Sequence, residues 1–245
     1  MAGHSKWANI KHRKGAEDAK RAKVFTRLAK EIIVSAKLAG SDENSNPRLR
    51  AAVIKARAAN MPKDNIERAI KKGAGELEGT NYEEITYEGY GPDGLAIMVE
   101  VMTDKKTRTL PEIKNLFSKN GGNLAETGAV AYSFEYKGHI IFESASKEDD
   151  LFELCLEAGA SDFNSSPEED SYFEVFSERD HFHSLLSVLE SRKEEELNIL
   201  ESGLKYFPTN TVELKDEKLQ KAEKLLNALE DHDDVQHVFS NLSDQ

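Results

Sequence analysis

The first thirty residues combine side chains that bind polyanions, within a chain whose overall charge is negative. They hold nine lysines and arginines against two acids, a net charge of +7, whereas the whole 245-residue chain has a formal net charge of −12. Aromatic rings that can stack on unpaired bases are interspersed among these cations. The candidate nucleic-acid contacts in this basic arm are therefore His4, Lys6, Trp7, Lys11, His12, Arg13, Lys14, Lys20, Arg21 and Lys23.

Two points about this arm stay open. Trp7 could instead be a packing anchor that pins the arm to the globular body, because large aromatic side chains are usually well buried. Basic positions further along could extend the footprint, although scattered cations on short helices are often only solvated. These positions are Lys55, Arg57, Lys63, Lys71 and Lys72.

The charge also divides by region. Residues 1–80 contain 18 basic and 9 acidic side chains, a net charge of +9, which leaves −21 for the remainder of the chain. Affinity for phosphates depends on local rather than average charge, so the acidic pI of 5.2 does not argue against nucleic acid. We expect the two regions to meet different partners.

Several motifs that could indicate catalysis or metal binding are better explained otherwise. Residues 89–94 match the dinucleotide fingerprint GxGxxG, but the following LAIMVEVMT predicts a strand rather than the helix that would hold a pyrophosphate, so a hairpin turn is the better interpretation. His181 and His183 point apart on a helix, and no acid or thiol completes a metal site around them. Acid runs such as 148–150, 168–170 and 194–196 are interpreted as solvated faces. We expect no enzyme activity, cofactor or metal.

Composition indicates a cytoplasmic globular protein. No apolar run approaches the ~20 residues of a membrane helix, and the basic N-terminus lacks the apolar stretch of a secretory signal. The single cysteine, Cys155, lies on the apolar side of a predicted helix and should be a buried, inert thiol.

The elements predict an α+β protein of several domains. Apolar spacing predicts three short helices up to Gly73, and Pro47 marks the start of the second. Strands are expected at 82–88 and 95–103, and Thr109 with Glu112 resembles a capping box for the next helix. Residues 139–204 read as one complete βαββαβ unit.

The flanking pieces predict a second unit of this ferredoxin-like kind. Strand 95–103, a helix from 110, strand 129–136, strand 210–214, a helix near 217 and strand 234–240 follow one another as βαββαβ. A string of smaller units is the alternative, but the tail alone could not bury both faces of a sheet. We therefore expect a basic arm and three-helix domain at 1–79, a split α+β domain at 80–136 plus 207–245, and an inserted α+β domain at 137–206.

Four segments resemble the YebC family, namely MAGHSKWANIKHRKGAEDAKRAKVF, NPRLRAAVIKA, YEGYGPDGLAIMVEVMTD and FSKNGGNLAETGAVAYSF. The resemblance implies the same three-domain layout. It also implies a role in gene expression, either as a DNA-binding transcriptional regulator or as a translational activator that acts on ribosomes, including relief of stalling at proline runs. The chain departs from the family pattern at TDKKTRT (103–109) and GGNLA (121–125), which leaves base readout by these loops in doubt.

The sequence therefore leaves two main hypotheses for the function, and a third as an alternative. The arm could bind DNA as a regulator of transcription, or ribosomal RNA with the acidic domains turned towards protein. The bland alternative is a protein-interaction scaffold in which the arm docks onto an acidic domain. The residues do not decide between DNA and RNA, and they show no helix with several base-reading side chains.

Overall fold

A computed structural model describes residues 18–165, 172–192 and 197–243. The chain divides into two compact units. One runs from Phe134 to Thr209, and the described part of the other consists of residues 18–133 and 210–243. Each unit is described by itself below.

Three helices open the larger unit, as the apolar spacing predicted. They are α2 (Asp18–Ala39), α3 (Pro47–Ala58) and α4 (Lys63–Gly73). α2 ends before Gly40, which has a φ of +92°, and α3 starts at Pro47 after the Asn46 side chain accepts a 3.0 Å hydrogen bond from the Leu49 N–H. Small and branched side chains close this bundle, including Ile32, Ala36, Leu49, Val53, Ala56, Ile66 and Ala69.

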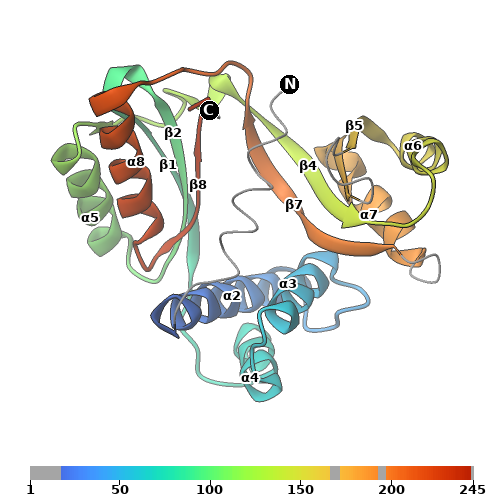
Figure 1. The fold of residues 1–245 in the computed structure, drawn as a ribbon. Helices are drawn as coiled ribbons and strands as arrows, with labels where there is room; N and C mark the ends of the chain where they lie inside the picture. The colour runs from blue at the N-terminus through green and yellow to red at the C-terminus, as the bar shows by residue number, and fades with distance from the viewer. Residues whose placement is uncertain (1–17, 166–171, 193–196, 244–245) are drawn as a thin grey trace. The chain divides into compact units, whose positions relative to one another are not determined.

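A four-stranded antiparallel sheet follows in the same unit. Its strands, in the spatial order β3-β1-β2-β8, are β3 (Asn123–Leu124), β1 (Glu83–Tyr90), β2 (Ala96–Thr103) and β8 (Val235–Ser240). Two helices, α5 (Lys106–Lys119) and α8 (Asp216–Glu230), pack side by side against one face of this sheet (Figure 1). Fully buried side chains fill the space between the layers, among them Val99, Ile113, Phe117, Leu225 and Leu229.

The strands of this sheet differ from those predicted. Strand 129–136 is instead a loop and short turn that leads into a strand at Phe134, and residues 210–214 contribute only one bridge, between Val212 and Leu242. β2 pairs with β1 and β8, and β1 was not part of the predicted βαββαβ order. The tight turn after Gly91, where the Gly91 N–H donates to the Leu95 carbonyl at 2.7 Å, pairs β1 with β2 along all of β1. Closing this short loop costs less entropy than recruiting a distant segment. The same turn confirms that GxGxxG is a hairpin.

The smaller unit has the βαββαβ order that the sequence predicted. Its sheet has the order β5-β6-β4-β7, which is the ferredoxin-like arrangement. The elements are β4 (Phe134–Glu143), α6 (Glu148–Glu157), β5 (Ala160–Ser165), β6 (Tyr172–Glu178), α7 (Phe182–Ser191) and β7 (Asn198–Pro208). The core between sheet and helices includes Ile140, Phe142, Cys155, Phe173 and Leu185.

The α+β fold class is thus confirmed, with a helical N-terminal region followed by two antiparallel sheets. The three domain boundaries predicted above stay a prediction. None of the described helices is long and apolar enough to cross a membrane.

Candidate nucleic-acid interface

Most of the predicted arm contacts lie outside the described residues. These are His4, Lys6, Trp7, Lys11, His12, Arg13 and Lys14. Lys20 and Arg21 belong to the start of α2, where the structure describes the backbone only. The structure describes the side chains of Lys23 on α2 and of Lys55 and Arg57 on α3.

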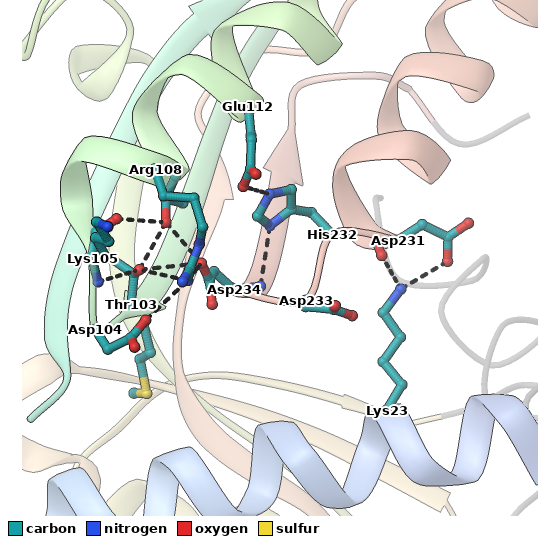
Figure 2. A network of polar contacts seen from close by, with 12 residues as sticks. Lys23, Thr103, Asp104, Lys105, Arg108, Glu112, Asp231, His232, Asp233 and Asp234 are labelled. Carbon is teal, nitrogen blue, oxygen red and sulfur yellow. Dashed lines mark hydrogen bonds and ion pairs between the residues drawn. The ribbon is translucent and has the colours of Figure 1, made fainter. Parts of the chain in front are cut away.

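One face of α2 carries three cations that all bind the end of α8 and the turn after it. Lys23, Arg27 and Lys30 follow the i, i+4, i+7 spacing of a single helix face. Lys23 Nζ donates to the main-chain carbonyl of Asp231 and, at 3.1 Å, to its Oδ1 (Figure 2). Arg27 Nη2 donates to the carbonyl of Glu230. These contacts are favourable because the C-terminal end of a helix attracts positive charge.

Lys30 is the buried member of this face. Its Nζ donates to Asp234 Oδ1 at 2.7 Å, to the Asp233 carbonyl at 3.0 Å and to the Met102 carbonyl at 3.2 Å. Both side chains of the Lys30–Asp234 ion pair are only 7% exposed. A buried ammonium is stable only when it is paired and hydrogen-bonded, and these three acceptors provide that pairing.

Asp234 joins the α2 face to the start of α5. Its Oδ2 accepts hydrogen bonds from Arg108 Nη2 and Thr109 Oγ1, both at 2.7 Å, and from Thr103 Oγ1 at 3.1 Å. Burial alone would raise the pKa of Asp234, but the hydrogen bonds from Lys30, Arg108 and Thr109 hold it well below its usual range. Asp234 is therefore a permanent carboxylate that holds α2 against the sheet.

The same network holds residues 103–109, the loop that leads from the end of β2 into the first turn of α5 (Figure 2). Thr109 was predicted to cap a helix that starts there, but it lies one turn inside α5. Its buried hydroxyl donates a hydrogen bond to Asp234 instead. Arg108 also pairs with Asp104 at 2.9 Å. The Lys105 and Lys106 residues that distinguish this loop from the family pattern are exposed. The loop is thus fixed from within and leaves these two positions at the surface.

A second polar network ties α2 and α3 to β1. Arg48 donates from Nε and Nη2 to the two oxygens of Glu31, at 2.7 and 3.1 Å, and from Nη1 to Glu84 Oε2 at 3.2 Å. Glu100, on neighbouring β2, is near this pair of acids. Burial, with repulsion from Glu31 and Glu84, raises the pKa of Glu100 to about 7, although Arg48 opposes the shift. These charged groups therefore join α2 and α3 to β1.

Further surface cations of the helical bundle lie on α3 and α4. Arg57 is exposed and pairs with Glu43 at 3.2 Å, and Lys63 pairs with Glu67 at 3.6 Å. Arg68 and Lys71 are exposed, and neither has a carboxylate within 4 Å among the residues that the structure describes. Arg68 was not among the predicted contacts. Its spacing of three residues before Lys71 on the same helix face is the signal that could have found it.

On the side away from its helices, the sheet of the smaller unit holds a buried polar pair, with His139 0% and Glu174 5% exposed. Ile140 and Phe142 of β4 face the helices, so alternation places His139 on the opposite face of its sheet. There the His139 Nε2 lies 2.6 Å from Glu174 Oε1, and the His139 ring lies 5.2 Å from Phe176. RNA-binding sheets of the same topology stack bases on aromatic residues of that face, but a carboxylate at its centre would repel phosphates.

The described part of the chain shows neither a metal-binding cluster nor a reactive thiol that could support catalysis. No group of three histidines, cysteines or acids there is arranged to hold a metal ion. Cys155 is fully buried, and burial raises its pKa to about 12, so the thiol stays protonated and unreactive.

Comparison with known proteins assigns the family. The model of the TACO1/YebC protein N-terminal domain matches residues 5–76, and that of the TACO1/YebC second and third domain matches residues 82–242. This chain belongs to the TACO1/YebC family. The resemblance seen in the sequence is thereby confirmed.

Relatives and a solved structure agree with this assignment. Proteins named "Probable transcriptional regulatory protein" from Syntrophobacter fumaroxidans and Nitrosomonas europaea are 50% and 53% identical over 98% of this chain, covering 95% and 98% of their own lengths. The crystal structure of a conserved hypothetical protein from Aquifex aeolicus superposes with a TM-score of 0.79 at 43% identity, covering 92% of this chain and 91% of that one. The TACO1/YebC fold is therefore shared, and relatives within the family are named as regulators.

Proposed function

We propose that this protein is a non-catalytic, nucleic-acid-binding regulator of gene expression that holds sugar–phosphate backbones through its basic arm and adjoining helices. The observation that carries this proposal is the +9 net charge of residues 1–80 in a chain of net charge −12. Such local concentration of positive charge is the electrostatic footprint of nucleic-acid binding. The name of its relatives, probable transcriptional regulatory protein, supports DNA as the partner and a cytoplasmic place of action.

The described contacts suggest how the positive charge is shared between folding and binding. Lys30 and Arg48 are engaged in holding the helices to the sheet. Arg68 and Lys71 on α4 are exposed and can extend the arm's footprint to a further phosphate or two. Contacts of this kind position a protein on the backbone without reading bases, so affinity should exceed sequence preference.

The salt dependence of binding tests this proposal. Each phosphate that a lysine or arginine neutralises adds about −0.9 to the slope of log K against log salt on duplex DNA. Changing Lys6, Lys11, Arg13, Lys14, Lys20 and Arg21 to Gln should therefore flatten that slope by about 5 in fluorescence anisotropy with a 20-bp duplex.

A matched control carries the same loss of charge elsewhere. The exposed lysines Lys114, Lys119, Lys147, Lys215, Lys221 and Lys224, changed to Gln together, should leave the slope nearly unchanged. A wild-type affinity that is flat between 50 and 200 mM salt, or equal losses in both variants, would contradict binding through the arm.

Ribosomal RNA is the second candidate partner, and the −21 net charge of the remainder favours it. A duplex-wrapping factor would gain little from so acidic a body, whereas a ribosome-bound factor could turn that body towards protein. Co-sedimentation with ribosomes at near-physiological salt, compared with a variant lacking residues 1–20, separates the two candidates. If the full-length protein stays in the supernatant, this second candidate is excluded.

A further inference from the structure

The acidic end of α8 presents Lys23 and Arg27 with the same chemistry as a nucleic-acid backbone. Both side chains donate to negatively polarised oxygens, namely the carbonyls of Glu230 and Asp231 and the Asp231 carboxylate. We propose that Lys23 and Arg27 form a phosphate-binding site that the end of α8 and Asp231 occupy in this structure, so that this contact competes with nucleic acid. This proposal rests on the function proposed above.

Burial divides the α2 face into a fixed and a releasable part. The Lys30–Asp234 pair is the fixed part, because both of its side chains are 7% exposed. In the Lys23–Asp231 pair, by contrast, the Lys23 side chain is 22% exposed and the Asp231 side chain is 82% exposed. Exposed ion pairs are individually weak, so solvent and a competing anion can replace Asp231 at little cost. Lys23 lies seven residues before Lys30, about 10 Å along the helix, and can exchange partners while Lys30 stays bound.

The spacing of the cations suits a polymer with repeated charges. Lys23 and Arg27 are four residues apart, so they lie one turn from each other on the same face of α2. That face continues directly from the basic arm in the sequence. A nucleic-acid backbone that binds Lys23 and Arg27 would have to displace Asp231 from Lys23.

Two neighbouring aspartates allow a matched test. Asp231→Asn removes the carboxylate that faces Lys23. Asp233→Asn removes the same charge two residues away. Among the described residues, Asp233 is contacted only at its main-chain carbonyl, which accepts a hydrogen bond from Lys30. Anisotropy titrations would use a labelled 20-bp DNA duplex and a labelled 20-nucleotide single-stranded RNA. Asp231→Asn should tighten binding of at least one probe by about twofold to fivefold relative to Asp233→Asn, the range expected for one exposed ion pair.

A double-mutant cycle assigns the effect to Lys23. In a Lys23→Gln background, Asp231→Asn should no longer tighten binding relative to Asp233→Asn. Hydrogen exchange without nucleic acid provides an independent measurement, because losing the contact should speed exchange near the start of α2 in Asp231→Asn more than in Asp233→Asn.

The outcomes separate this proposal from the function on which it rests. If the wild type binds with a steep salt dependence but the two variants bind alike, the competition is refuted while the function stands. Tightening that persists in the Lys23→Gln background, or hydrogen exchange that is the same in both variants, also refutes it. If the wild type binds neither probe at any salt concentration, both proposals fall.

Discussion

Replacing Asp234 by Ala should destabilise the larger unit more than any neighbouring acidic substitution. The change leaves Lys30, 6% exposed, without a carboxylate, and also removes one acceptor of Arg108 and one of Thr109. Leaving a buried charge unpaired typically costs 3–5 kcal/mol. Lys30 keeps the carbonyls of Met102 and Asp233 as acceptors, so we expect the lower end, about 3 kcal/mol in the free energy of unfolding.

Urea denaturation followed by far-UV circular dichroism measures this loss, and hydrogen exchange locates it. Exchange should rise in α2 and in residues 103–109, because Asp234 joins these two segments. Asp233→Ala is the control, since its exposed side chain has no hydrogen-bond or ion-pair partner among the residues that the structure describes, and it should change stability by no more than about 0.5 kcal/mol. A loss below about 1 kcal/mol for Asp234→Ala would refute the interpretation of Asp234 as the central anchor.

The pH dependence provides a second check on the same residue. The folded protein lowers the pKa of Asp234 relative to the unfolded chain, where an Asp titrates near 4. Its contribution is therefore present above about pH 4 and is lost as pH falls from there towards the lowered folded pKa. The stability difference between wild type and Asp234→Ala should be constant from pH 7 to about 5 and shrink below about pH 4. A difference that grows on acidification would contradict this sign.

Three further predictions concern single residues. The folded pKa of Glu100, about 7, exceeds its unfolded value, so the wild type should lose stability as pH rises through 7, while Glu100→Gln should not. If the melting temperatures of the two proteins change in parallel from pH 5 to 8, this prediction is contradicted. A Cβ at Gly89 would lie 2.6 Å from the Phe117 ring and 2.7 Å from the Asn123 carbonyl, so Gly89→Ala should cost about 1–3 kcal/mol in urea denaturation, and a loss under 0.5 would argue against this close approach. Cys155 should react with a thiol reagent only on unfolding, and rapid labelling of the native protein would show that it is accessible.

Local patterns predicted most of the elements but not every pairing between them. The three N-terminal helices and the βαββαβ order of the smaller unit follow from apolar periodicity, Pro47 and the turn glycines. Two strands predicted for the sheet of the larger unit, 129–136 and 210–214, are not part of it, and β1 pairs with β2. Periodicity identifies a strand without naming its neighbour, and here the tight turn after Gly91 decided the pairing.

The roles of individual polar and charged residues were harder to predict. Lys23 looked like one more cation of the arm, yet it binds the end of α8, which lies 208 residues away in the chain. Thr109 looked like a helix cap, but its hydroxyl instead donates a hydrogen bond to Asp234. Nothing in the local sequence of either residue signals these partners, because an ion pair or hydrogen bond across the fold depends on distances that only packing sets.

From its sequence alone, this protein has a charge imbalance between its first 80 residues and the rest, a set of helices and strands, and membership of a family. These are properties of composition and short-range pattern, so they can be determined without knowledge of the fold. Only the tertiary structure decided which cations hold α2 to the sheet and which acids they bind. That division arises because burial makes the Lys30–Asp234 pair permanent, whereas exposure leaves the Lys23–Asp231 pair open to exchange.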